Sequence, residues 1–268
     1  MEFIKLFQNH SEYGGFVSGG TMVKPNVSHC IQENEVHYNH YHDYSKDYLT
    51  IESLEDNNII SLYASNTSIT KTVSVSTDNG TTWTEYTSSV SSSGTTLATL
   101  NNGDKLLVKG ENSTYTTGMS KYNQFKTTGQ FDVKGNIMSL VSGDSFANAD
   151  ELTASYTFRM LFSQCTGLTS AENLILPATT LASYCYSSMF YSCTSLTTAP
   201  ELPATTLVNR CYQNMFSNCT SLATEAIVPD NVDKPISSSY CAYMYCGCPI
   251  TTHNGNYNET AYECEGIS

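Results

Sequence analysis

The 268-residue chain is long enough to bury a sizeable core in one large domain or in two to three small ones. It carries 25 acidic and 12 basic side chains, and the resulting formal charge of −13 disfavours nucleic acid as a partner, because phosphate binding needs basic surface. No apolar run reaches the roughly 18 residues that a transmembrane helix requires, so membrane insertion is not expected.

Two further features concern the compartment. Only 14% of the residues are charged, whereas Ser, Thr, Asn and Tyr are abundant, as is typical of extracellular and virion-surface β proteins. The opening stretch MEFIKLFQNHSEYGG turns polar after Phe7 and lacks the pattern of a secretory signal, so ordinary secretion is not expected. A virus particle assembled in the cytoplasm and released by lysis is consistent with both features.

Residues 1–46 show no sustained periodicity and contain two Gly-Gly pairs and Pro25, so we expect an irregular N-terminal docking arm. Its apolar and aromatic side chains would be exposed without a partner. The candidate docking residues are Phe3, Phe7, Tyr13, Phe16 and Val17. The stretch EVHYNHYHDY contains His37, His40 and His42, but the interleaved tyrosines favour a polar aromatic surface over a metal site.

Residues 47–140 contain short β-rich runs separated by turn residues, such as IISLYAS, KTVSVS and KLLVKG. Asp78-Asn79-Gly80 between TVSVS and TTWTEY predicts a hairpin, because Asn and Gly accept a positive φ. At least five such runs predict a small immunoglobulin-like β-sandwich. Trp83 has two interpretations, a platform for stacking on a sugar or a core residue, and the alternation in TTWTEY favours the core.

Residues 141–268 contain an internal repeat. LFSQCTGL, MFYSCTSL and MFSNCTSL are successive copies, and their cysteines, Cys165, Cys193 and Cys219, are 28 and 26 residues apart. This period is typical of leucine-rich-repeat and related solenoids. MYCGCPI, near Cys248, is a degenerate last copy, and the preceding TEAIVPDNVDKPISSS predicts a terminal cap.

Each repeat predicts one apolar face. Cys185, Met189 and Phe190 are spaced i, i+4 and i+5, which predicts that they share one face of a short helix. Stacked repeats would bury these faces in a continuous core. The predicted solenoid core consists of Cys165, Leu168, Leu176, Cys185, Met189, Phe190, Cys193, Leu196, Leu202, Cys211, Met215, Phe216, Cys219 and Leu222.

The ten cysteines fall into two groups. Those at equivalent repeat positions are predicted to be reduced core residues, since a free cysteine behaves as a small hydrophobe. Cys241, Cys246, Cys248 and Cys264 lie close together near the C-terminus, and which of them form a disulfide is left open. A metal site in CAYMYCGC is disfavoured because no histidine or further CxxC pair is nearby, and no cofactor is predicted.

The repeated motif also has a chemical alternative. LPATT resembles the sortase signal LPxTG, but it occurs twice internally and has Thr in the fifth place, so we interpret it as part of the repeat. The order LPATTL, Cys-Tyr and MFxxCTSL closely resembles the repeats of BspA-like leucine-rich-repeat proteins of gut Bacteroides and of their phages. The N-terminal SEYGGFVSGGTMVKPN and the STDNGTTWTEY region resemble modules that precede such repeats, including those in crAss-like phages.

This resemblance implies adhesion or virion decoration rather than catalysis. The expected fold is mainly β with short helices, comprising an arm (1–46), a β-sandwich (47–140) and a solenoid with a cap (141–268). The expected function is that of a non-enzymatic head or tail fibre at the virion surface, assembled as a homo-oligomer such as a trimer. The arm would bind capsid or tail proteins, and the repeats a host glycan or protein. The alternative is an adhesin at the bacterial cell surface; a polysaccharide-degrading enzyme is the least favoured.

Overall fold

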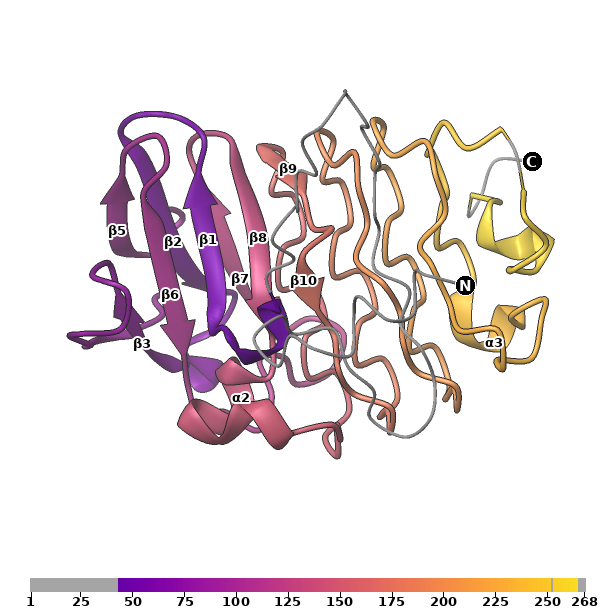
Figure 1. The fold of residues 1–268 in the computed structure, drawn as a ribbon, viewed down its shortest axis with the longest axis horizontal. Helices are drawn as coiled ribbons and strands as arrows, with labels where there is room; N and C mark the ends of the chain where they lie inside the picture. Colours follow the sequence, from indigo (N-terminus) through magenta and orange to yellow (C-terminus); the bar gives the residue numbers. More distant parts are fainter. Residues whose placement is uncertain (1–42, 252, 265–268) are drawn as a thin grey trace, which may run out of the picture. The chain divides into compact units, whose positions relative to one another are not determined.

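The computed structural model of the protein describes residues 43–251 and 253–264. The chain divides into two units, and only the second, Tyr44–Ser268, is described below. The candidate docking residues and the three neighbouring histidines therefore lie outside the described residues. The second unit is mainly β with a few short helices, which confirms the predicted class (Figure 1).

Two sheets form the first part of this unit. The larger has the strand order β10-β8-β1-β6-β3-β4, with β9 also paired to β8. Its strands are β1 (Leu49–Ser53), β3 (Thr72–Ser76), β4 (Thr84–Thr87), β6 (Lys105–Lys109), β8 (Phe131–Asn136), β9 (Leu168–Ser170) and β10 (Leu174–Ile175). The smaller sheet has the order β5-β2-β7 and consists of β2 (Asn58–Ala64), β5 (Thr95–Leu100) and β7 (Asn123–Thr127).

The helices are short. Two are α-helical and four are 3-10 helices within the described residues. They are α2 (Ser139–Ser142), α3 (Ser238–Cys241), η1 (Tyr44–Lys46), η2 (Thr67–Ile69), η3 (Gly143–Asn148) and η4 (Glu259–Ala261). None of them is long and apolar enough to span a membrane.

The predicted hairpin joins β3 to β4, which pair antiparallel. Asn79 and Gly80 have φ values of 56° and 84°, the conformation for which Asn and Gly are suited. The Asp78 carboxylate accepts hydrogen bonds from Ser76 and Thr82, which lower the pKa of Asp78 to about 2. The turn sequence therefore fixes the hairpin through its backbone preference and through this carboxylate.

The strand order differs from that of an immunoglobulin constant domain. There the first two strands pair with each other. Here β1 pairs with β6 and β8, whereas β2 pairs with β5 and β7 in the other sheet. The consecutive strands β1 and β2 thus lie in different sheets, which period-two alternation in the sequence does not reveal.

Four turn segments (156–165, 184–193, 210–219 and 239–248) follow β8 in the chain, and β9 and β10 lie between the first two of them. The predicted short helix of each repeat is wrong, because 184–193 is a run of turns and contains no helix. In the second segment Tyr184, Ser188 and Ser192 have φ values of 59°, 56° and 58°, which an α-helix excludes. Because a residue with positive φ recurs at every fourth position, the turns also repeat every four residues. The i, i+4 spacing of the buried side chains, which had suggested a helix, therefore fits the turns as well.

The backbone amides explain why turns replace the helix. In the second segment Ser187 and Met189 donate to the carbonyls three residues earlier, of Tyr184 and Tyr186. The alternate amides donate to carbonyl oxygens of the next segment. Tyr186 donates to Cys211, Ser188 to Gln213 and Phe190 to Met215. A helix would use its amides internally, whereas this arrangement keeps every second donor for the neighbouring segment.

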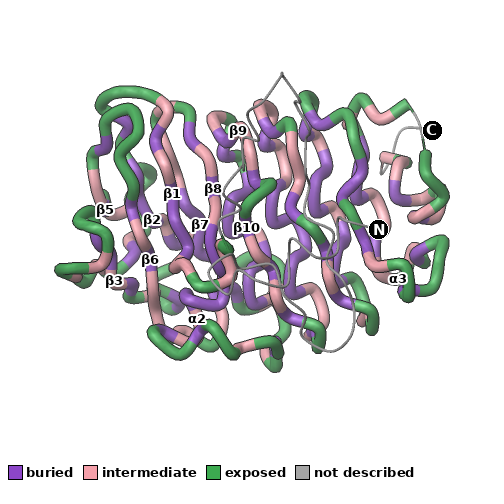
Figure 2. Tube along the Cα trace, in the orientation of Figure 1, coloured by how far each residue is buried: buried purple, intermediate pink, exposed green. Residues whose placement is uncertain are grey.

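The sheets and the turn segments are continuous with each other. β9 and β10 pair in parallel with β8, and isolated bridges link Ser170 to Thr198 and Thr180 to Thr206. Along the other side, Phe125 of β7 donates its amide to Leu161 in the first segment. A single hydrophobic core runs from β1 to the last segment, so buried residues recur in every layer of Figure 2. The stacked segments thereby cover sheet edges that would otherwise invite aggregation.

Candidate functional site

The fourteen predicted core residues are all buried. Leu176 and Cys165 are the most accessible of them, each with 2% of its surface exposed. Their burial leaves none of them available to a macromolecular partner. They hold the turn segments together, and a binding site must be sought on side chains that point away from this core.

Two columns of stacked rings run through the core. In the first, Phe162, Phe190 and Phe216 follow one another with ring centroids 5.8 and 5.5 Å apart. This column begins at Phe125 of β7 and ends at Tyr245 and Tyr262. The second column consists of Tyr115, Phe158, Tyr186 and Tyr212. Such offset ring pairs add about 0.5–1.5 kcal/mol each beyond the burial of their area.

A column of thiols runs beside the rings. The thiol of Cys193 donates to the carbonyl oxygen of Phe162, and Cys219 donates to Phe190, at 3.0 and 3.1 Å. Cys165 and Cys248 repeat the contact with Phe125 and Phe216. These four cysteines are free, as predicted for Cys165, Cys193 and Cys219, whereas the state of Cys248 was left open. Burial raises the pKa of the Cys165 and Cys248 thiols to about 12, so both are neutral and unreactive near pH 7.

Alkali is expected to destabilise the protein through these thiols. Burial raises the pKa of four buried or half-buried thiols, those of Cys165, Cys211, Cys241 and Cys248, to about 12, while the unfolded chain releases its thiol protons near pH 9. Because the folded state binds more protons between these values, the thiol contribution to stability is constant below about pH 9 and falls as the pH rises toward 12. Each such thiol should cost about 1 kcal/mol at pH 10, measured by urea unfolding across the pH range.

A matched variant isolates the thiol contribution. Cys211→Ala removes one of the four titrating groups and should make the fall between pH 9 and 11 shallower, although its stability at neutral pH is lower. An unchanged slope in this variant would show that other groups, such as the buried tyrosines, account for the whole alkaline transition.

In the native state at pH 8, Cys193 and Cys219 should resist alkylation and should react only after denaturation.

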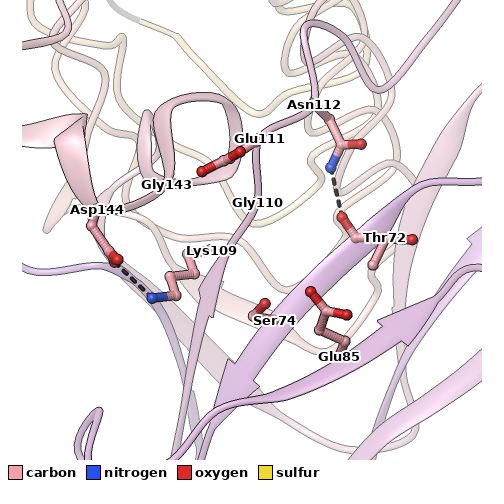
Figure 3. Close-up of a pocket in the computed structure, with 9 residues that line it drawn as sticks. All are labelled: Thr72, Ser74, Glu85, Lys109, Gly110, Glu111, Asn112, Gly143 and Asp144. Atoms are coloured by element: carbon pink, nitrogen blue, oxygen red, sulfur yellow. Dashed lines mark hydrogen bonds and ion pairs between the residues drawn. The ribbon is translucent and has the colours of Figure 1, made fainter.

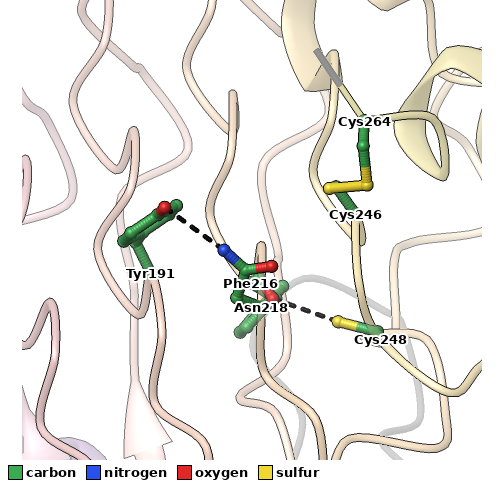
Figure 4. The surroundings of a disulfide bond; sticks show 6 residues. All are labelled: Tyr191, Phe216, Asn218, Cys246, Cys248 and Cys264. Carbon is green, nitrogen blue, oxygen red and sulfur yellow. Dashed lines mark hydrogen bonds between the residues drawn. A yellow bond between two sulfur atoms is a disulfide. The ribbon is translucent and has the colours of Figure 1, made fainter. Parts of the chain in front are cut away.

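The C-terminal cap contains the disulfide whose partners the sequence left open. Cys246 and Cys264 are bonded, with Cα atoms 5.0 Å apart (Figure 4). Cys248 remains free and donates to the Phe216 carbonyl oxygen, and Asn218 donates to the Tyr191 hydroxyl group beside it. Tyr243 and Tyr245 donate their amides to Thr260 and Ala261, so the last strip of chain covers the fourth turn segment.

The core interpretation of Trp83 is wrong. Its side chain is only partly buried, and Trp83 lies in the turn before β4, outside the hydrophobic core. The ring packs at 4.9 Å against Tyr48, the Lys109 ammonium group lies 4.2 Å from its centroid, and its Nε1 donates to Gly80. The alternation rule failed because it applies within a strand and not in the turn that precedes it.

A groove of about 400 Å³ lies next to this cluster. Its lining comes from β3, β4, the end of β6, the residues that follow β6 and the start of η3, and Figure 3 shows the side chains. Most of its polar groups bind one another: Lys109 pairs with Asp144 at 2.7 Å, and Asn112 donates to the Thr72 carbonyl oxygen. The remaining carboxylates, Glu85 and Glu111, make the groove acidic, but its cation and its amide already have partners within the protein.

The residues with positive φ define a second surface, which we call the turn face. Its three columns run across the turn segments at intervals of four residues. They consist of Tyr156, Tyr184 and Arg210; of Met160, Ser188, Asn214 and Tyr243; and of Gln164, Ser192, Asn218 and Gly247. Tyr156 and Tyr184 stack at 4.8 Å, and the Arg210 guanidinium group lies 5.6 Å from the centroid of the Tyr184 ring. Sequence reasoning missed this face, although Asn214 and Asn218, four residues apart in the third segment, were a signal for it.

A pocket of about 410 Å³ opens on the turn face, between the third and fourth turn segments. It is lined by Asn209, Arg210, Gln213, Ser238, Ser239, Ala242, Tyr243 and Thr260. In contrast to the groove near Trp83, the side chains of Asn209, Gln213 and Ser239 form no hydrogen bond with any part of the chain that the structure describes. This pocket is therefore the stronger candidate for binding an external ligand.

No family model matches the chain, and no curated protein or solved structure is significantly similar to it. Among residues 43–251 and 253–264, no group of three His, Cys, Asp or Glu side chains could hold a metal ion. The candidate site consequently rests on the geometry of the turn face alone.

Proposed function

We propose that the protein is a non-enzymatic fibre of a phage head or tail, displayed on the virion surface. In this proposal the N-terminal arm docks on capsid or tail proteins, the β-sandwich is a spacer, and a BspA-like leucine-rich-repeat solenoid presents the turn face to a host glycan or protein. The fibre acts as a homo-oligomer such as a trimer.

The observation that carries the proposal is the direct continuity of the stacked turn segments with the sheets. Backbone hydrogen bonds link each segment to the next, and one core spans them all. A rigid rod of this kind holds an exposed surface at a fixed distance from an attachment point. Its buried thiols are also poor nucleophiles, which fits a scaffold better than a catalyst.

The thiol column also favours a particle over an exported adhesin. Seven cysteines of the described residues are free, and six of these are buried. A chain folding in the reducing cytoplasm buries its thiols before any oxidant reaches them, whereas an exported chain would meet an oxidising compartment while unfolded. The disulfide Cys246–Cys264 joins residues of the terminal cap, where oxidation after release can reach them.

Removal of the arm tests the docking role. We place the truncation after Asp43 because the Ser45 carbonyl oxygen accepts a hydrogen bond from Asn136, at 2.9 Å, and belongs to the folded unit. The truncated protein should remain soluble and folded but should be missing from purified particles. A full-length Phe3→Ser/Phe7→Ser/Phe16→Ser variant should lose most of its incorporation for the same reason.

Quantitative mass spectrometry of purified particles measures the outcome. A matched full-length control, Tyr191→Ser, removes one partly buried ring from the repeats and should be incorporated like the wild type. If the truncated protein is present at wild-type stoichiometry, residues 1–43 are not the docking segment. Docking would then be assigned to the sandwich or the repeats.

A further inference from the structure

The pocket on the turn face has an unusual set of unoccupied polar groups. The amides of Asn209 and Gln213 and the hydroxyl groups of Ser238 and Ser239 line it, together with the Arg210 guanidinium group. None of these side chains is hydrogen-bonded within the described part of the chain. Amides and hydroxyl groups can each donate and accept, so a ligand rich in hydroxyl groups would find complementary partners here.

Arg210 is the charged group of this pocket. It is exposed, and no carboxylate among the described residues forms an ion pair with it. By contrast, Lys105, Lys109, Lys134 and Lys234 are each paired with an acidic side chain. An unpaired guanidinium fork is suited to bind a planar carboxylate through two parallel hydrogen bonds.

An aromatic strip leads to this guanidinium group. The Tyr184 ring lies beneath Arg210 and stacks on Tyr156, and the Tyr243 side chain contributes to the pocket wall. Apart from Ala242, the pocket has no aliphatic lining. A peptide would need an apolar anchor for appreciable affinity, whereas a sugar ring needs a flat aromatic surface and hydrogen bonds.

The pocket lies where the repeat loses its regularity. In the fourth segment α3 (Ser238–Cys241) replaces the first turns, whereas the second and third segments are runs of turns. Departures from local regularity are expected where a sequence serves binding rather than packing.

From these observations we infer that the turn-face pocket binds an acidic saccharide, one whose sugar ring carries a carboxylate. Arg210 binds the carboxylate, the amides and serines bind the ring hydroxyl groups, and Tyr243 lies against the ring. The inference rests on the proposed function, since it specifies what the presented repeats would recognise.

Titration calorimetry on the full-length protein tests the inference with two pairs of probes. They are 3′-sialyllactose with lactose, and a glucuronic-acid-terminated disaccharide with its glucose-terminated counterpart. At low salt at least one acidic probe should bind about tenfold or more tightly than its neutral counterpart, as expected for a charge-assisted pair. Arg210→Gln should abolish this difference.

Two further variants make the result specific. Lys121→Gln changes the net charge equally but alters an exposed cation of the sandwich, and it should keep the preference. Ser239 is exposed, and Ser239→Ala should weaken the binding of both probes of a pair by a similar factor. This variant replaces Arg210→Gln in the test if Arg210→Gln fails to fold. The inference would be overturned if the acidic and neutral probes bound equally, if neither bound, or if Arg210→Gln kept the preference. It would also be overturned if a glutamate-rich peptide bound more tightly than the acidic saccharides.

This experiment is independent of particle docking. If Arg210→Gln protein is incorporated normally and the wild type shows no preference for acidic saccharides, the pocket assignment fails while the fibre proposal stands. If the acidic probes bind as expected but the protein is missing from particles, the fibre proposal fails and the pocket remains.

Discussion

Replacing Leu196 with aspartate is expected to unfold the stacked turn segments. Leu196 is fully buried, and its amide donates to the Cys193 carbonyl oxygen at the corner of the second segment. An uncompensated carboxylate there costs several kcal/mol, which is comparable with the 5–15 kcal/mol stability of a typical domain. Circular dichroism should show loss of structure, and limited proteolysis should cleave the chain between residues 150 and 264.

The control for this variant is Thr206→Ala. Thr206 is exposed and forms only an isolated bridge with Thr180, so its replacement should change stability by less than about 0.5 kcal/mol. An unaltered spectrum and protease resistance in Leu196→Asp would mean that this residue does not face the core on which the stacking depends.

Phe190→Ala is expected to cost about 3–5 kcal/mol of unfolding free energy. Phe190 is fully buried and stacks on Phe162 and Phe216, so its removal leaves a cavity between two segments and interrupts the ring column. Backbone hydrogen bonds keep neighbouring segments at a fixed separation, which limits how far the cavity can collapse. Urea unfolding monitored by fluorescence and circular dichroism measures the loss.

Tyr184→Ala is the matched comparison because Tyr184 also stacks on a ring of the preceding segment, but on the partly exposed turn face. It should cost only about 1 kcal/mol. Equal losses in the two variants would show that ring stacking, rather than burial in a shared core, supplies the stability of the column.

The repeat was the most predictable part of the structure. Cys193 and Cys219 recur in the same sequence context, and stacking places equivalent residues in equivalent environments, so their burial followed from the repeat alone. The local conformation did not follow. The i, i+4, i+5 spacing of Cys185, Met189 and Phe190 fits a helix, but it fits equally a run of turns with positive φ at every fourth residue.

Other features depended on contacts that the sequence does not encode locally. Trp83 was assigned to the core because the turn before β4 was included in the alternating strand. The pairing of Cys246 with Cys264 depends on how the cap folds back over the fourth segment. The turn-face pocket joins Arg210 to Ser239 and Thr260, and their proximity arises only when successive segments stack.

Immunogold electron microscopy of purified phage particles tests the fibre proposal most directly. An antibody raised against residues 44–264 should label the particle surface, with gold at the head or at the tail according to the fibre's position. Labelling should disappear when the arm is removed, while the truncated protein remains in the soluble fraction. Gold on the surface of uninfected bacterial cells, with none on particles, would contradict the proposal and would support the adhesin alternative.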